Sequence, residues 1–376
     1  MRKRNEARGR IWRRAPGIAL FAATVAFSTA PHAYDVTEWL SLEFVAARMG
    51  QCQDLARGGG ANDDCDGALP AQSGISLRPT DNDEIYLKAG FAAGDGLNEK
   101  SPFTLSSWAA DLEDDVKDIN GRWDYLLNAW YRHDFHFRDD VSLAVTLGVI
   151  DATDYLDDNA FSNDEYGQFM NEAFVNSPQG FLPGYDLGAA LALEVGRWSA
   201  RAVVMEIGKN DAGNSFAFYG GQLAYRLVTP LGEGNYRVVV VGTDREFLDP
   251  TSTREERLLA GGLSFDQQLG ETFGVFLRSG WQSECAAVDY DAAYSAGINI
   301  RGAAWGREND NVGAAYGYLS GGNQGLRATH VAEAYYRLVL FEHIGLTADA
   351  QYMFDDLRAG GGPRGFIFGL RATAEF

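Results

Sequence analysis

Residues 364–376 read RGFIFGLRATAEF, and their side chains alternate in kind from one position to the next. In an extended chain one face would carry only apolar groups, namely Phe366, Phe368, Leu370, Ala372, Ala374 and Phe376. The other face would carry Gly365, Gly369, Arg371, Thr373 and Glu375, with Ile367 as the exception. A period of two is the pattern of a β-strand with one apolar and one polar face. The stretch therefore predicts a strand that ends the chain on an aromatic residue.

The segment before it, residues 344–355, repeats the pattern. Its apolar positions are Leu346, Ala348, Ala350, Tyr352 and Phe354, and its polar positions are Thr347, Asp349, Gln351 and Asp355. A lysine or arginine that faces lipid near the bilayer midplane costs about 2–4 kcal/mol, and a slip of one residue would exchange the two faces. We therefore expect Asp349 and Arg371 to face inward.

Similar runs continue along the chain from residue 37 and number roughly sixteen. The first is predicted over residues 37–48 and is followed by a long loop over 49–73; a second long loop is predicted over 94–121. Long connections alternate with tight turns, as in outer-membrane barrels, whereas a soluble β-sandwich does not sort its loops in this way. The pattern predicts an all-β protein, a sixteen-stranded antiparallel transmembrane β-barrel.

The segment from Asp151 to Pro183 breaks the alternation. It reads DATDYLDDNAFSNDEYGQFMNEAFVNSPQGFLP and lies between two predicted strands. We predict a short helix from Asp164 to Phe174 and an inward fold that narrows the lumen. The alternative is that the segment caps the mouth of the barrel. The residues expected at the constriction are Asp154, Asp157, Asp158, Asn159, Asp164 and Glu165.

The first 33 residues predict a signal peptide. Seven lysines and arginines precede a short apolar core and a run of small residues. We favour cleavage after Ala33 over cleavage after Ala30, because Pro31 would follow the latter. The mature barrel domain is then residues 34–376, and its net charge falls from −20 to about −26. This charge argues against nucleic acid as a partner, and it fits an acidic surface bridged by divalent cations to lipopolysaccharide.

Three cysteines are present, and two of them, Cys52 and Cys65, lie close enough in sequence to form a disulfide. Cys285 would remain unpaired. We expect no metal centre and no cofactor; Asp154 to Asn159 offers oxygen ligands for loose Ca²⁺ binding but lacks the glycine of an EF-hand loop. The sequence shows no obvious nucleophile and base, which leaves an enzyme as a distant third interpretation.

Four stretches resemble the OprB family of carbohydrate-selective porins. They are YLLNAWY at 125–131, LGVID at 147–151, QFMNEAFVN at 168–176, and the tail from AYYR at 334–337 through LTADAQY at 346–352 to FGLR at 368–371 and Phe376. The resemblance implies a monomeric sixteen-stranded barrel in the bacterial outer membrane that passes glucose-like sugars into the periplasm. The terminal Phe376 resembles the aromatic signal that the outer-membrane assembly machinery reads. The cysteine-bearing first loop and the acidic second loop depart from the family pattern.

Alternation also predicts which side chains line the path of the sugar. Aromatic faces suit the C–H surfaces of sugars, and charged groups suit their hydroxyls. The lumen residues expected on this basis are Tyr86, Lys88, Asn128, Trp130, Arg132, Arg226, Glu333, Arg337, Asp349 and Arg371. The alternative for each is an ordinary polar lumen residue in contact with water. A nonspecific cation-preferring porin is the second functional hypothesis, because acidic residues are frequent in the loops.

Overall fold

The computed structural model describes residues 34–57, 60–110, 112, 125–177, 180–210 and 213–376. The predicted signal peptide lies outside the described residues. No helix in the described part of the chain is long and apolar enough to cross a membrane.

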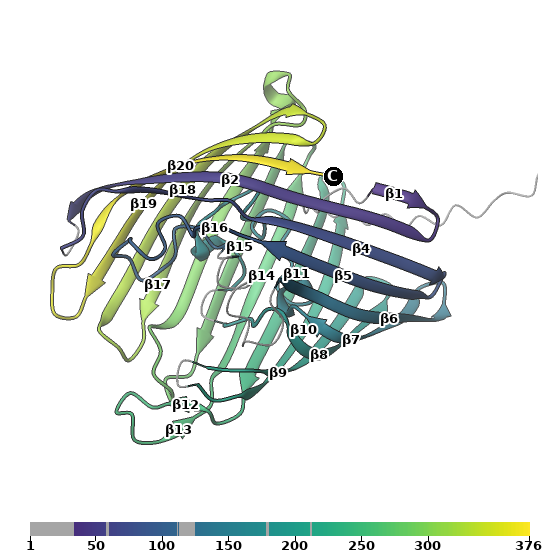
Figure 1. The fold of residues 1–376 in the computed structure, drawn as a ribbon, viewed down its shortest axis with the longest axis horizontal. Coiled ribbons are helices and arrows are strands. Elements are labelled where there is room, and N and C mark those ends of the chain that lie inside the picture. Colours follow the sequence, from purple (N-terminus) through teal and green to yellow (C-terminus); the bar gives the residue numbers. More distant parts are fainter. Residues whose placement is uncertain (1–33, 58–59, 111, 113–124, 178–179, 211–212) are drawn as a thin grey trace, which may run out of the picture.

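Sixteen long antiparallel strands form a closed barrel (Figure 1), as predicted. They are β2 (Leu40–Arg57), β4 (Ala71–Thr80), β5 (Asp83–Phe91), β6 (Leu126–Arg138), β7 (Val141–Ile150), β8 (Asp186–Val195), β9 (Trp198–Ile207), β10 (Phe216–Thr229), β11 (Gly232–Thr243), β14 (Leu259–Leu269), β15 (Phe273–Gln282), β16 (Tyr290–Arg301), β17 (Asn311–Gly321), β18 (Leu326–Phe341), β19 (Ile344–Leu357) and β20 (Arg364–Glu375). Short strands β1 (Tyr34–Thr37) and β3 (Cys65–Ala68) pair with β2, and β12 (Phe247–Leu248) pairs with β13 (Glu255–Glu256) in a separate hairpin.

The barrel closes where the last strand pairs with the first long one. The register of β2 and β20 runs from Val45 opposite Glu375 to Arg57 opposite Arg364. Beyond it, the backbone N–H of Phe376 donates to the carbonyl of Phe44 at 2.8 Å, and the N–H of Phe44 donates back at 2.9 Å. Closure leaves no free sheet edge, which a barrel in lipid requires.

The outer and inner faces of β20 differ as the alternation predicted. Phe366, Phe368 and Leu370 are 47%, 51% and 54% exposed, whereas Arg371 is fully buried. Large apolar side chains on the outside with a charged one inside are the reverse of a water-soluble domain. This is the arrangement of a transmembrane barrel.

The long strand β2 corrects the first predicted loop. It extends to Arg57, so all of residues 49–57 are strand, and β3 pairs with Met49 to Cys52. The outward positions in this part of β2 are small or polar, for example Gly50 and Asp54. Such a composition is typical of a loop. Strands that continue beyond the bilayer lose the apolar face by which they are recognised in sequence.

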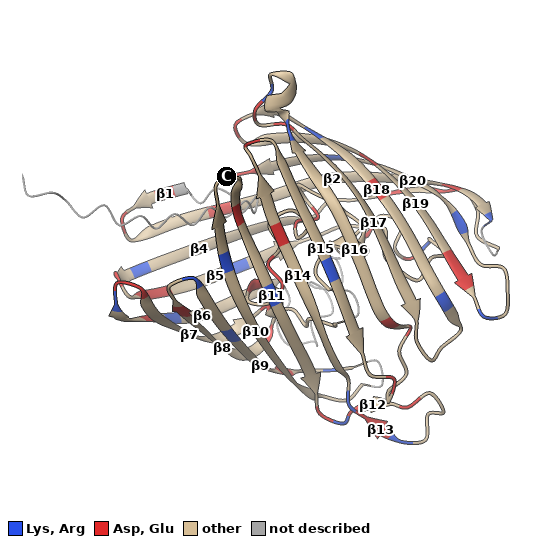
Figure 2. Cartoon of the chain, turned by 180° about the vertical axis from the view of Figure 1, so that it is seen from behind, with Lys and Arg blue, Asp and Glu red and all other residues tan. Residues whose placement is uncertain are grey.

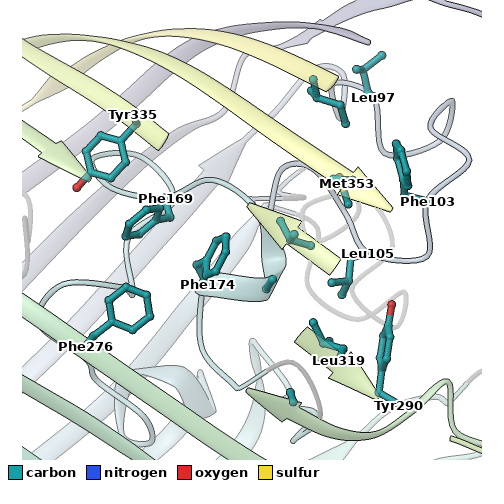
Figure 3. Packing of buried hydrophobic residues seen from close by; sticks show 14 of the residues in the cluster. Leu97, Phe103, Leu105, Phe169, Phe174, Phe276, Tyr290, Leu319, Tyr335 and Met353 are labelled. Carbon is teal, nitrogen blue, oxygen red and sulfur yellow. The ribbon is translucent and has the colours of Figure 1, made fainter. Parts of the chain in front are cut away.

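Two connections fold into the barrel and pack against its inner wall. The segment between β7 and β8 contains Phe161, Phe169 and Phe174, all buried. The connection after β5 contributes Leu97, Phe103 and Leu105 to the same apolar cluster (Figure 3). The core of the molecule therefore lies inside the lumen, between these loops and the wall.

Candidate functional site

The loop from Asp151 to Pro183 is seated on an apolar part of the inner wall. The ring of Phe169 packs 5.0 Å from that of Tyr335 on β18 and 5.7 Å from that of Phe276 on β15, measured between centroids (Figure 3). Phe174 lies 5.3 Å from Phe169 in the same cluster. The segment therefore folds inward, as predicted, and does not cap the mouth.

No α-helix forms from Asp164 to Phe174, so that prediction is wrong. The segment contains turns and one short 3₁₀ helix, η2 (Glu172–Phe174); another, η1 (Ala152–Asp154), opens the loop. The backbone N–H groups of Met170 and Asn171 donate to the carboxylate of Glu333 at 2.6 and 3.1 Å. Because wall side chains satisfy the backbone donors, helical hydrogen bonds are not needed there.

A buried arginine on β15 fixes the middle of the loop. The Nε of Arg278 lies 3.0 Å from the Asp157 carboxylate. Its Nη1 donates to the carbonyl of Phe174 at 2.9 Å and to the hydroxyl of Ser162 at 3.1 Å. One guanidinium thus joins positions far apart along the loop.

Two further arginines hold the neighbouring carboxylate. Asp158 accepts from Nη1 of Arg201 at 3.0 Å and from Nε of Arg237 at 2.7 Å. Asn159 donates to the Ser264 hydroxyl and the Phe265 carbonyl. Asp157, Asp158 and Asn159 therefore anchor the loop to β9, β11, β14 and β15, and they do not stand free in the lumen.

The four arginines predicted to line the lumen do not hold these acids. Arg132 instead pairs with Asp134 at 2.8 Å, and Arg226 lies 3.7 Å from Glu233. Arg337 pairs with Glu375 at 2.7 Å. The side chain of Arg371 donates to the backbone carbonyls of Gln168, at 2.6 Å, and of Glu165. It therefore contacts the backbone of the loop and not its carboxylates.

Sequence reasoning missed Arg201, Arg237 and Arg278. Alternation does place them inward, but their inner-face neighbours are apolar, for example Val239, Val241 and Phe276. Where a loop packs on the inner face of a strand, that face is apolar as well as the outer one. The sequence then does not indicate which face points inward.

Four predicted lumen residues face inward from β18 to β20 and are all buried, namely Glu333, Arg337, Asp349 and Arg371. Glu333 and Arg371 bond to the loop. Asp349 accepts from Gln351, and Arg337 pairs with Glu375.

The second inward connection, residues 92–110, is hydrogen-bonded to the loop from Asp151 to Pro183. The N–H of Ser106 donates to the Glu172 carboxylate at 3.0 Å, and the N–H of Ala109 donates to the carbonyl of Met170 at 2.8 Å. Thr104 bonds to Asp355 of β19 through its N–H and its hydroxyl. The sequence predicted this segment only as a long loop.

Open space remains on the other side of the loop, against β2, β4 and β5. It comprises two adjoining cavities of about 350 and 240 Å³. The residues that line both are Gln72, Asp151, Thr153, Asn163, Glu165, Tyr166 and Tyr185. We take this shared rim as the constriction.

The constriction contains two acids, Asp151 and Glu165, and no base among the described residues. The smaller cavity is further lined by Asp154, Asp164, Glu43 and Glu375, and Lys88 is the only base among its described lining residues. Asp154 is exposed to the cavity, and its enclosure within the barrel together with the nearby Asp151 raises the pKa of its carboxyl group to about 7. Enclosure and Asp164 likewise raise the pKa of Glu165 to about 7.

Trp130 of β6 and Tyr86 of β5 form an aromatic pair on the inner wall. The rings of Trp130 and Tyr86 are 5.0 Å apart and tilted by 30°, and the Tyr86 hydroxyl donates to Glu43. Both side chains face inward and are only partly buried. Asn128, by contrast, is buried within the wall.

Cys52 and Cys65 form a disulfide on adjacent strands, and Cys285 is free and exposed. Among residues 34–376, leaving out the gaps given above, no three His, Cys, Asp or Glu side chains are grouped to hold a metal ion.

The sequence model of a family described as "Carbohydrate-selective porin, OprB family" matches residues 84–376. An uncharacterized protein of Aquifex aeolicus is 28% identical over 300 residues, 78% of this chain and 84% of that protein. The high-pH structure of Pseudomonas putida OprB superimposes with a TM-score of 0.69 at 14% identity, covering 90% of this chain and 94% of that one. A triple mutant of the Rhodopseudomonas blastica porin gives 0.51 at 12% identity, with 90% and 100% covered.

Proposed function

Because the chain belongs to the OprB family of carbohydrate-selective porins, we propose that it admits glucose-like sugars across the outer membrane into the periplasm by passive diffusion. The family and the fold indicate a channel rather than an enzyme. The tight turns then face the periplasm, and the loop-rich end faces outward.

The observation that carries this proposal is the composition of the open side of the lumen. The Trp130–Tyr86 pair offers partly exposed aromatic faces, while Lys88, Glu43 and Asp154 supply polar groups in the adjoining cavity. A sugar has apolar C–H faces and hydroxyl edges, so it can exchange its hydration for both kinds of contact.

Binding at such a site is expected to be weak, because a channel must release what it binds. A dissociation constant of about 1 mM corresponds to about −4 kcal/mol. One stacking contact and a few hydrogen bonds account for a free energy of this size.

A nonspecific, cation-preferring pore is the second candidate. It is favoured by the acids at the constriction, which outnumber the bases among the described residues lining the two cavities. Arg201, Arg237 and Arg278 form ion pairs with Asp157 and Asp158 of the loop. The carboxylates that line the two cavities therefore have little positive charge opposite them.

Channel recordings in a planar bilayer separate the two candidates. A sugar-selective channel loses current as glucose is added, with saturation, whereas sorbitol at the same viscosity has a weaker effect. A nonspecific pore shows the same small, unsaturable effect with both. The second result would overturn the proposal.

A further inference from the structure

Two arginines face each other at the outer end of the barrel seam. Arg57, at the end of β2, stands opposite Arg364, the first residue of β20. Both are exposed. Arg364 lies two residues from Phe366, which is on the outer face, and is separated from it by the buried Gly365. The register shifts between Leu55 and Arg57, and the pairing resumes at Arg57 opposite Arg364. Residues paired across an antiparallel ladder point to the same side, so both exposed side chains lie on the outer face. Figure 2 shows basic residues in blue at this end of the β19–β20 region.

Neither arginine has an acidic partner. Among the described residues no carboxylate lies within ion-pair distance of Arg57 or Arg364; Asp54, on the same face, stands opposite Phe366 and pairs with neither. Other arginines of this rim are satisfied by the protein. Arg327 pairs with Asp356 at 3.1 Å, and Arg358 donates to the carbonyls of Gly321 and Gly322.

Two like charges directly opposite each other destabilise a sheet. This pair is retained on a chain whose overall net charge is −20. A ligand with negative charge would remove the repulsion. A Cβ placed on Gly361 in the adjoining turn would lie 3.6 Å from Nη1 of Arg57, so the glycine leaves that side of the guanidinium without a side chain.

The height of the pair on the barrel indicates the kind of ligand. Phe366 stacks on Phe368 with centroids 5.9 Å apart and contacts Tyr352 of β19 at 5.0 Å. Such outward aromatic groups mark the boundary between hydrocarbon and headgroups. Arg364 lies two residues further out, which is about 7 Å along a strand. That is the level of lipid headgroups.

We propose that Arg57 and Arg364 together bind a phosphate of the phosphorylated glycolipid that forms the outer leaflet, the lipid A part of lipopolysaccharide. Guanidinium groups bind phosphate through paired N–H donors. This contact is direct and needs no divalent cation, unlike the bridged acidic surface that the net charge alone suggested. The proposal relies on the outer-membrane placement of the barrel but not on sugar selectivity.

The test measures lipid A bound to the purified mature protein in detergent by native mass spectrometry. Wild type is compared with the double variant Arg57→Gln/Arg364→Gln and with Arg327→Gln, a matched control whose arginine has its own carboxylate. Bisphosphorylated lipid A is compared with its fully dephosphorylated form, each with and without EDTA. Heat-modifiable gel mobility and glucose block confirm that each variant is folded and conducts.

The double variant should bind bisphosphorylated lipid A at least tenfold less than wild type and Arg327→Gln do. EDTA should leave wild-type binding unchanged, and the dephosphorylated lipid should bind as weakly as in the double variant. Equal binding by wild type and the double variant would overturn the proposal, as would loss of wild-type binding in EDTA. Because glucose block is recorded on the same preparations, failure here is distinguishable from failure of the sugar channel.

Discussion

Individual side chains in the lumen do two separate jobs. Arg201, Arg237 and Arg278 hold the loop through Asp157 and Asp158. The open side carries Trp130 and Tyr86 and a constriction rich in carboxylates. The proposed function therefore gives recognition and support to different residues, and the two roles can be tested independently.

Trp130→Ala should weaken sugar block. Loss of one aromatic face removes roughly 1 kcal/mol of contact, which raises the half-blocking sugar concentration about fivefold. Ion conductance should stay nearly constant or rise slightly, since the loop anchors remain. Trp198→Ala is the matched control, because Trp198 is exposed on the outer wall and contacts Tyr225 at 4.8 Å. Equal block in wild type and Trp130→Ala would remove Trp130 from the sugar path.

Ion selectivity should depend on pH near neutrality. Asp154 and Glu165 both have pKa values raised to about 7, so they are largely neutral at pH 5.5 and ionised at pH 8.5. Cation preference should therefore rise with pH across this interval. Reversal potentials in a KCl gradient measure it.

The variant Asp154→Asn/Glu165→Gln tests the assignment of that pH dependence. It should lose most of the change in selectivity between pH 5.5 and 8.5. A variant that keeps the full change would show that other groups are responsible.

At the scale of elements, we propose that the loop is the feature that makes this barrel a selective channel. Its attachment depends on a charge pair shielded from solvent, Arg278 with Asp157, whose side chains are 4% and 0% exposed. Removing one partner of a buried pair typically costs 3–5 kcal/mol, because the other charge is left without compensation.

Arg278→Ala should therefore detach the loop and give a larger, noisier conductance with little sugar block. Arg226→Ala provides the comparison, since Arg226 is half-exposed and lies 3.7 Å from Glu233 near a tight turn. Single-channel recordings of both variants, with gel mobility as a folding control, are sufficient. An unaltered conductance in Arg278→Ala would mean that apolar packing alone seats the loop.

The elements differ in how far their sequences predict them. The bounds of β20 were predicted within one residue, because alternation against lipid leaves little freedom. The loop was located but its conformation was not. Its backbone donors bond to Glu333, on a strand more than 150 residues away, and no local pattern encodes such a partner. The arginine anchors were missed for the related reason that an inner face covered by a loop is apolar.

For the whole molecule, closure between β2 and β20 sets the barrel's stability. Nearly every backbone N–H in lipid must be bonded between strands, and Phe44 and Phe376 complete that network. The detergent-solubilised protein should migrate faster on gels when unheated than after boiling, and its circular dichroism should be β-rich in both wild type and channel variants. A monomer that is soluble without detergent would contradict the barrel.

Glucose titration of single-channel current, in wild type and in a variant with residues 156–176 replaced by a short flexible linker, tests the central claim most directly. The claim is that the anchored loop forms a sugar-selective constriction. Wild-type current should fall with glucose and be half-blocked in the millimolar range, corresponding to about −4 kcal/mol. The shortened variant should conduct more and lose the block. The same conductance and the same block in both proteins would show that the loop plays no part in selecting the sugar.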